Sequence, residues 1–192
     1  REEAQLDNGE LFVALAVALE RLGVVWHEQH VIDDVSVLAS DFDVVIDARG
    51  IGAKDSLSIR GVRGEVLTVD APEVTLQRPV RLMHPRYMLY VVPRANHRFI
   101  IGATELESED MGEVTVRSAL ELLSALYSVH SGFAEARIVK WSVNCRPALP
   151  DNLPFVGWKD GVLTVNGLYR HGYLLAPACV ESALSLLTGD CS

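Results

Sequence analysis

The most informative stretch of this 192-residue sequence reads NGLYRHGYLLAP, residues 166–177. It follows a short β-branched segment, residues 162–165, and leads into apolar residues at helical spacing, 179–187. Unpaired N–H groups and the positive end of a helix dipole collect at such a strand-to-helix turn, where they favour an anion or a negatively polarised ring. A plain structural connection explains the same pattern. Because Pro177 fits best in a first helical turn, the helix is predicted to begin between residues 172 and 176.

A second informative stretch, NCRPALPDNLP, lies just upstream at residues 144–154. Arg146 stands at the end of a predicted strand, 138–143, and a stiff, proline-punctuated turn follows it. A guanidinium group is a planar fork that can hold a carboxylate by two parallel hydrogen bonds, and a rigid flank would fix its direction. The alternative is an internal ion pair with an acid such as Asp151. The sequence pattern alone favours that alternative.

Outward from these stretches, the chain predicts a mixed α+β or α/β fold. Asp7 and Glu10 resemble a capping box, and leucines at helical spacing follow until Gly23, which predicts a first helix. A second helix is predicted over residues 115–130, and residues 60–64 are predicted to be a connector. Short β-branched or apolar runs predict strands at 24–26, 31–32, 35–38, 44–46, 65–69, 80–83, 88–92, 99–102, 138–143 and 162–165.

Composition excludes several classes of partner. With 26 acidic and 17 basic residues the formal net charge is −9, which opposes binding to nucleic acid or to an anionic membrane surface. The longest apolar stretch, residues 11–19, is too short to cross a bilayer. Three cysteines without C-x-x-C spacing argue against a disulfide framework and a zinc site. No secretory signal, which would be a positively charged region followed by an apolar run, is visible at the start of the sequence. We therefore expect a cytoplasmic protein.

Other candidate motifs are weak. Gly50-x-Gly52 follows a predicted strand, but Asp55 occupies the third glycine position of a dinucleotide loop, so we interpret it as a turn. His27 and His30 would point to opposite faces of a strand. The acidic residues between 105 and 113 lack the spacing of a calcium loop, and no G-x-S-x-G elbow is present. Neither a metal site nor a hydrolase is predicted.

Six segments carry a resemblance to a known family. They read VVIDARG at 44–50, RGVRGE at 60–65, YVVPR at 90–94, IIGAT at 100–104, RPALPD at 146–151 and GLYRHGYLLAP at 167–177. In these segments and in their order the sequence resembles the D-amino-acid oxidase superfamily of FAD-dependent oxidoreductases, most closely its glycine oxidases of thiamine biosynthesis. The resemblance spans nearly the whole chain.

The resemblance implies an FAD-binding domain interleaved with a substrate domain, a mostly antiparallel β-sheet flanked by helices. Residues 1–60 and 146–192 would belong to the FAD-binding domain, and residues 61–145 to the substrate domain. The family's N-terminal strand, glycine-rich loop and helix, which hold the FAD pyrophosphate, have no counterpart in these 192 residues. We therefore expect a C-terminal portion whose partner is the missing N-terminal FAD-binding segment, and we expect the isolated chain to be colourless and inactive.

The resemblance also implies roles for individual residues. Arg146 would grip the substrate carboxylate, the Tyr90 hydroxyl would help to orient it, and Arg170 would lie beside substrate and flavin. Met88 and Glu105 would occupy pocket positions. The implied FAD contacts are Val31, Gly50, and the backbone of Leu168, Tyr169, Arg170, His171, Gly172, Tyr173 and Leu174.

The reaction that the resemblance implies is hydride transfer from the α-carbon of a small amino acid, glycine, to FAD. The product would be an imine for thiazole formation, with oxygen as electron acceptor. One alternative is another substrate, such as a D-amino acid or sarcosine, or a quinone acceptor. Another is a non-catalytic carboxylate-binding module, and a homo-oligomer is compatible with either.

Overall fold

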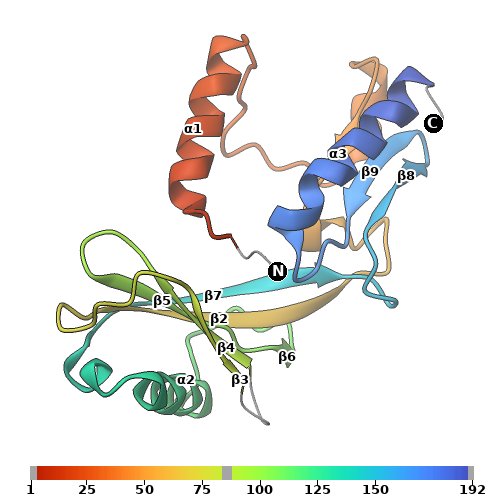
Figure 1. Cartoon of the computed structure of the whole chain (residues 1–192). Coiled ribbons are helices and arrows are strands. Elements are labelled where there is room, and N and C mark those ends of the chain that lie inside the picture. Colours follow the sequence, from red (N-terminus) through yellow and green to blue (C-terminus); the bar gives the residue numbers. More distant parts are fainter. Residues whose placement is uncertain (1–3, 84–87, 190–192) are drawn as a thin grey trace. The chain divides into compact units, whose positions relative to one another are not determined.

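The computed structural model describes residues 4–83 and 88–189, which divide into two compact units (Figure 1). The first unit comprises residues 1–32, 66–103 and 119–141, and the second comprises 33–65, 104–118 and 142–192. The mixed helix and strand content confirms the predicted fold class. The division into FAD-binding and substrate domains at residues 60 and 146 stays a prediction.

An antiparallel sheet is the main element of the first unit. Its strands follow the order β3, β4, β5, β2, and β7 also pairs with β2. The register places Val80 opposite Val91 and Leu67 opposite Ile101. The strands are β2 (Arg60–Asp70), β3 (Val80–Met83), β4 (Met88–Pro93), β5 (Arg98–Gly102) and β7 (Arg137–Ala148). In the second unit, a short β6 (Leu106–Glu107) pairs with the beginning of β2 at Arg63.

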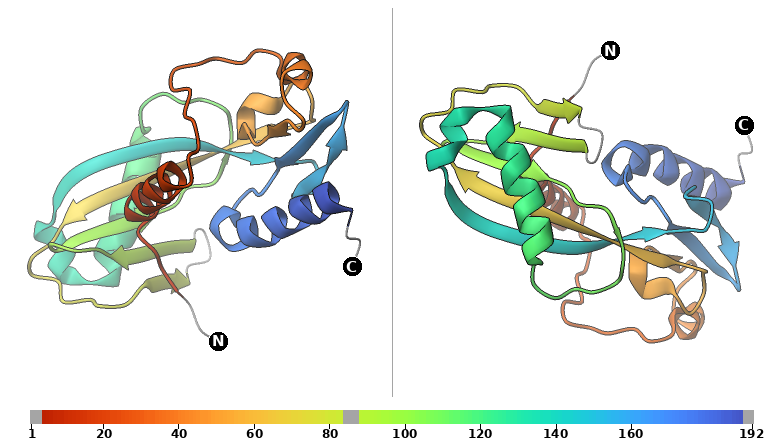
Figure 2. Two further views of the ribbon diagram at one scale, coloured as in Figure 1. Left: turned by 90° about the horizontal axis from the view of Figure 1, so that it is seen from above. Right: turned by 90° about the horizontal axis from the view of Figure 1, so that it is seen from below.

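Helix α2 (Val116–Val129) covers one face of this sheet (Figure 2). Leu122 and Leu126 of the helix are buried in one cluster with Leu67 and Ile101 of the strands. Full burial of one such side chain stabilises the fold by about 1.5–3 kcal/mol. The helix predicted over residues 115–130 is therefore confirmed, and the apolar side chains that repeat at helical spacing in it contribute to the core of the unit.

Helix α1 (Asn8–Arg21) begins as the sequence predicts. The carboxylate of Asp7 accepts hydrogen bonds from the N–H groups of Gly9 and Glu10 at 2.9 and 3.2 Å. Asp7 also forms an ion pair with Arg94, 3.3 Å away. None of the helix residues is buried.

No helix within residues 4–83 and 88–189 has both the length and the apolarity needed to cross a membrane.

The second unit contains a three-stranded sheet with α3 (Gly172–Thr188) packed beside it. The order is β1 (Ile46–Asp47), β9 (Val162–Asn166), β8 (Phe155–Lys159), with β1 parallel and β8 antiparallel to β9. Cys179 and Ala183 bury the inner face of α3. The predicted strand at 162–165 and helix at 179–187 are confirmed.

Several local predictions are wrong. Residues 35–38, predicted as a strand, belong to a 3₁₀ helix, η1 (Val35–Ser40), because the Asp34 carboxylate caps the N–H of Ser36 at 2.8 Å. Residues 24–26 and 31–32 form no strand, and the predicted connector at 60–64 is the beginning of β2. Strand β8 was not predicted. The predicted beginning of the last helix, between residues 172 and 176, is by contrast confirmed: α3 begins at Gly172, and Pro177 lies in its second turn, where one helical hydrogen bond is lost.

Candidate functional site

Arg146 lies on β7 and is half-buried. Its Nη1 donates to the backbone carbonyls of Thr104, at 3.3 Å, and Arg63, at 3.5 Å. The alternative ion pair between Arg146 and Asp151, both of them described residues, is wrong: the two side chains do not pair, and a carboxylate oxygen of Asp151 accepts from the N–H of Leu153 at 3.0 Å. Within residues 4–83 and 88–189 no carboxylate is paired with Arg146. Its guanidinium is therefore fixed by neutral acceptors.

Gly64 provides the space in which this guanidinium lies. A Cβ atom at Gly64 would come within 2.5 Å of Nη1 of Arg146, and within 2.6 Å of both Cζ and Nη2. Such distances are too short for real contacts, so any larger residue would displace the charged group. Gly64 is needed here for close approach rather than for a positive φ.

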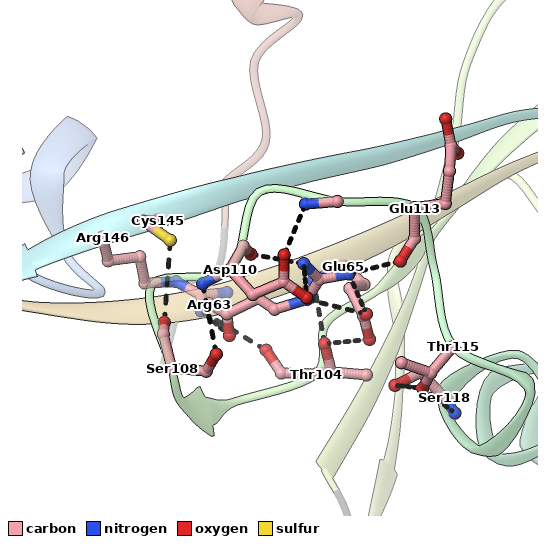
Figure 3. A network of polar contacts seen from close by, with 11 residues as sticks. Arg63, Glu65, Thr104, Ser108, Asp110, Glu113, Thr115, Ser118, Cys145 and Arg146 are labelled. Carbon is pink, nitrogen blue, oxygen red and sulfur yellow. Dashed lines mark hydrogen bonds and ion pairs between the residues drawn. The ribbon is translucent and has the colours of Figure 1, made fainter.

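A buried ion pair lies next to Arg146 (Figure 3). Arg63 is 2% exposed and Glu65 is fully buried. Nε and Nη2 of Arg63 donate to one carboxylate oxygen of Glu65 at 3.0 and 2.8 Å, and the hydroxyl of Thr104 donates to the other at 2.9 Å. Burial acts to raise the pKa of Glu65, but hydrogen bonds from Ser118, Arg63 and Thr104 outweigh it and hold the pKa below its usual value. The network fixes Thr104, whose carbonyl accepts from Arg146.

Arg63 also anchors the acidic loop that follows residue 107. Arg63 donates to the carbonyls of Asp110 and of Glu113, the latter at 2.8 Å (Figure 3). The N–H of Gly61 donates to Glu109 at 2.9 Å. The loop is thus tied to β2 at several points. In the part of the chain that the structure describes, no group of three or more His, Cys, Asp or Glu residues is arranged to hold a metal ion.

Arg170 and Tyr169 meet the carboxylate of Glu105. Nη1 of Arg170 lies 3.0 Å from one oxygen of Glu105, and the Tyr169 hydroxyl donates to the other. Burial and the hydrogen bond to Glu105 raise the pKa of Tyr169. The backbone of Tyr169, in the left-handed region with φ 48°, donates its N–H to the carbonyl of Pro147 at 3.2 Å.

These contacts bring the two predicted arginines into one site. Arg146 contacts Thr104, and Arg170 contacts Glu105, the next residue of the same segment. The hydrogen bond from Tyr169 to Pro147 joins the segments that carry the two arginines. We call this group the paired-arginine site; it consists of Thr104, Glu105, Arg146, Tyr169 and Arg170.

Gly50 has a different, structural contact. Its backbone is in the left-handed region, with φ 59°, and its carbonyl accepts from the side-chain amide of Asn166 at 2.9 Å. Nearby, Asp47 forms an ion pair with Arg49 at 2.9 Å. Burial acts to raise the pKa of Asp47, but hydrogen bonds from Arg49 outweigh it and lower the pKa. The predicted turn after the strand is therefore fixed internally.

The remaining predicted residues lie elsewhere. Val31, Met88 and Tyr90 belong to the first unit. The others lie in the second unit, at the beginning of α3 or directly before it: Leu168, His171, Gly172, Tyr173 and Leu174. Sequence reasoning missed Gly64, Thr104 and the buried pair of Arg63 and Glu65. The segments RGVRGE and IIGAT were the signal available for them.

Comparison with known proteins identifies the family. Residues 1–183 match the family model described as DAO, FAD dependent oxidoreductase. The chain belongs to this family. As a member of the DAO family it is similar to the Rhizobium etli protein assigned as the thiamine biosynthesis oxidoreductase ThiO, with 48% identity over 98% of this chain and 57% of that protein.

Similarity extends to a glycine oxidase from Geobacillus kaustophilus, 29% identical over 91% of this chain and 51% of the relative. The crystal structure of glycine oxidase from that organism superposes with a TM-score of 0.67 and 28% identity, covering 78% of this chain and 42% of the other. The chain therefore spans about half the length of the curated relatives it matches.

Proposed function

We propose that this chain forms part of an FAD-dependent amino acid oxidase that acts on glycine, and that it contributes to both the FAD-binding and the substrate domain. Membership of the DAO family and the similarity to ThiO and glycine oxidase support the reaction type. The observation that carries the proposal is Arg146: a half-buried guanidinium, seated against Gly64 and bonded to two carbonyls.

The electrostatics of Arg146 explain why a carboxylate fits. The backbone carbonyls of Arg63 and Thr104 orient the guanidinium but do not neutralise it. A partly desolvated cation favours an anion more strongly than a cation in water does. The carboxylate of an amino acid supplies that charge and can accept two parallel hydrogen bonds. Binding by this end would position the α-carbon for reaction.

Residues around α3 support a role in holding FAD. His171, at the N-cap, makes no side-chain capping hydrogen bond, and a Cβ at Gly172 would meet no atom within 4 Å. The first N–H groups of the helix and its positive dipole end suit an electron-rich ring. We propose that residues 168–174, together with Val31 and Gly50, contact FAD, and that Tyr90 orients the substrate. When bound, FAD accepts the hydride from the α-carbon.

The proposed domains are residues 1–60 with 146–192 for FAD and 61–145 for the substrate. The similarity to ThiO supports a role of the imine product in thiamine biosynthesis. Cys145 and Cys179 are free thiols, which agrees with a cytoplasmic location.

The test uses the full-length, FAD-loaded protein with a panel of glycine, sarcosine, D-alanine and D-proline. We expect glycine to bleach the flavin absorption without oxygen and to yield peroxide in air. Bleaching without peroxide would indicate another electron acceptor, such as a quinone. If no amino acid bleaches the flavin, the oxidase proposal is wrong and a carboxylate-binding module is favoured.

Gly64→Ala is expected to raise the KM for glycine by about 10- to 100-fold, because the added methyl group displaces the Arg146 guanidinium. Steady-state kinetics of the FAD-loaded protein check this. Gly52→Ala is the matched control, since a Cβ there meets only Cβ of Arg49, at 3.4 Å. A normal KM in folded Gly64→Ala would show that the position of this guanidinium does not matter.

A further inference from the structure

We propose that Glu105 sets the charge of the paired-arginine site, so that it accepts amino acids with one carboxylate and rejects those with two. The inference rests on the proposed function and makes Glu105 a specificity-determining residue. The carboxylate of Glu105 lies 3.0 Å from Nη1 of Arg170. In the sequence, Glu105 directly follows Thr104, whose carbonyl accepts from Arg146.

The charges of the site add up to one uncompensated cation. Arg146 and Arg170 contribute two positive charges, and Glu105 contributes one negative charge. Arg170 is neutralised by its ion pair with Glu105, whereas Arg146 contacts only carbonyls among the residues that the structure describes. A single substrate carboxylate therefore balances the site. A second one would meet a neutralised arginine and the negative charge of Glu105.

Both oxygens of Glu105 are held in place. One accepts from the Tyr169 hydroxyl and the other pairs with Arg170. The preceding residue, Thr104, is fixed to the buried Glu65 by its hydroxyl. The side chain of Glu105 is nevertheless 43% exposed and that of Arg170 is 39% exposed. The carboxylate is thus fixed in direction and still accessible to a ligand.

Among the described residues, one further carboxylate near the site belongs to Asp110, 3.4 Å from Arg63, the arginine that pairs with the buried Glu65. Arg60 lies 6.0 Å from the centre of the Tyr169 ring, but it forms an ion pair with Glu107 at 3.2 Å. Farther along the loop, Glu109 is paired with Lys54. Glu105 is the acidic residue in direct contact with Arg170, and its charge there opposes a second substrate carboxylate.

The experiment compares Glu105→Gln with the unchanged full-length, FAD-loaded protein. Glutamine keeps the size of the side chain and can still accept from Tyr169, but it leaves Arg170 uncompensated. We expect the kcat/KM ratio of iminodiacetate to glycine, and that of D-aspartate to D-asparagine, to rise about 10-fold or more. Glu107→Gln, which removes a neighbouring carboxylate paired with Arg60, is the control and should leave both ratios unchanged.

A binding measurement separates this inference from the proposed function. Malonate and acetate carry two and one carboxylates and do not react, so calorimetric titration compares them without turnover. Glu105→Gln is expected to raise the affinity for malonate relative to acetate by about 10-fold or more. Unchanged ratios, with glycine oxidation intact, would overturn the role of Glu105 and leave the oxidase proposal standing. Failure of every amino acid to reduce the flavin, with a shifted malonate preference, would overturn the oxidase proposal alone.

Discussion

Arg146→Leu is expected to raise the KM for glycine by about 30- to 5,000-fold, which corresponds to about 2–5 kcal/mol of lost binding. Leucine keeps an apolar side chain at this position but removes the positive charge and the parallel N–H donors of the guanidinium. The two carbonyls that accept from Nη1 of Arg146 would also lose this donor. Steady-state kinetics of the FAD-loaded, full-length protein, with a flavin spectrum to establish that the cofactor is bound, measure the effect.

Two further variants serve as a conservative substitution and a control in this experiment. Arg146→Lys keeps the positive charge but loses the planar fork, so an intermediate loss is expected. Arg137→Leu removes an exposed arginine from the beginning of the same strand and should leave the KM unchanged. If Arg146→Leu retains the glycine dependence of the unchanged protein, Arg146 does not bind the carboxylate.

The elements that were predictable from sequence are those with a strong period. The leucines of α1 and α2 repeat at helical spacing, and the strands β3, β4 and β5 are separated by turn residues. Residues 24–38 mislead because β-branched side chains favour a strand only when neighbouring strands are there to pack against. Val25 and Val31, for example, are 74% and 81% exposed.

Strand β8 was missed although the sequence contains a signal for it. Asp160 and Gly161 both have positive φ, 49° and 80°, and form the two-residue turn that joins β8 to β9. An Asp-Gly pair between two apolar runs is typical of such hairpins. Gly157 and the exposed Trp158 weaken the alternation of β8, so its strand pattern is poor without its partner.

The site was predictable only in part, for a different physical reason. Arg146 and Arg170 stand in recognisable segments, but their surroundings come from contacts between residues far apart in the sequence. Nothing in the sequence alone indicates that Gly64 lies against Arg146, or that Glu105 pairs with Arg170. Such contacts depend on how the strands are paired, and local patterns do not specify them.

Arg63→Met is expected to lower the free energy of unfolding by about 3–5 kcal/mol, because it leaves the Glu65 carboxylate buried without its counter-ion. Arg63 also donates to the carbonyls of Asp110 and Glu113, so the acidic loop loses its anchor. Denaturant unfolding of the full-length protein, followed by circular dichroism, measures the change. Arg98→Met is the control, because the ion pair between Arg98 and Asp70 is partly exposed and its atoms are 4.0 Å apart. This variant should lower the free energy of unfolding by less than about 1 kcal/mol.

Two more measurements separate charge from packing at this pair. The double variant with Arg63→Met and Glu65→Met removes both charges and should recover much of the stability, because well-packed apolar residues often replace a buried ion pair without loss. The lowered pKa of Glu65 also predicts how stability responds to pH. Its contribution is present above the unfolded glutamate pKa of about 4.3 and is lost as the pH falls through the lower pKa of the folded protein.

Glu65→Gln should remove this part of the acid sensitivity and lower the stability at neutral pH, because Arg63 would lose its buried counter-ion and keep only the exposed carboxylate of Asp110, 3.4 Å away. Unfolding curves measured at several pH values between neutral and about 3 compare the two proteins over the window in which the carboxyl titrates. Equal slopes would show that Glu65 has the same pKa folded and unfolded. A loss below about 1 kcal/mol in Arg63→Met would show that the buried pair does not hold the Thr104 segment against Arg146. The rigidity of the carboxylate-binding guanidinium would then have to come from Gly64 and the strand β7 alone.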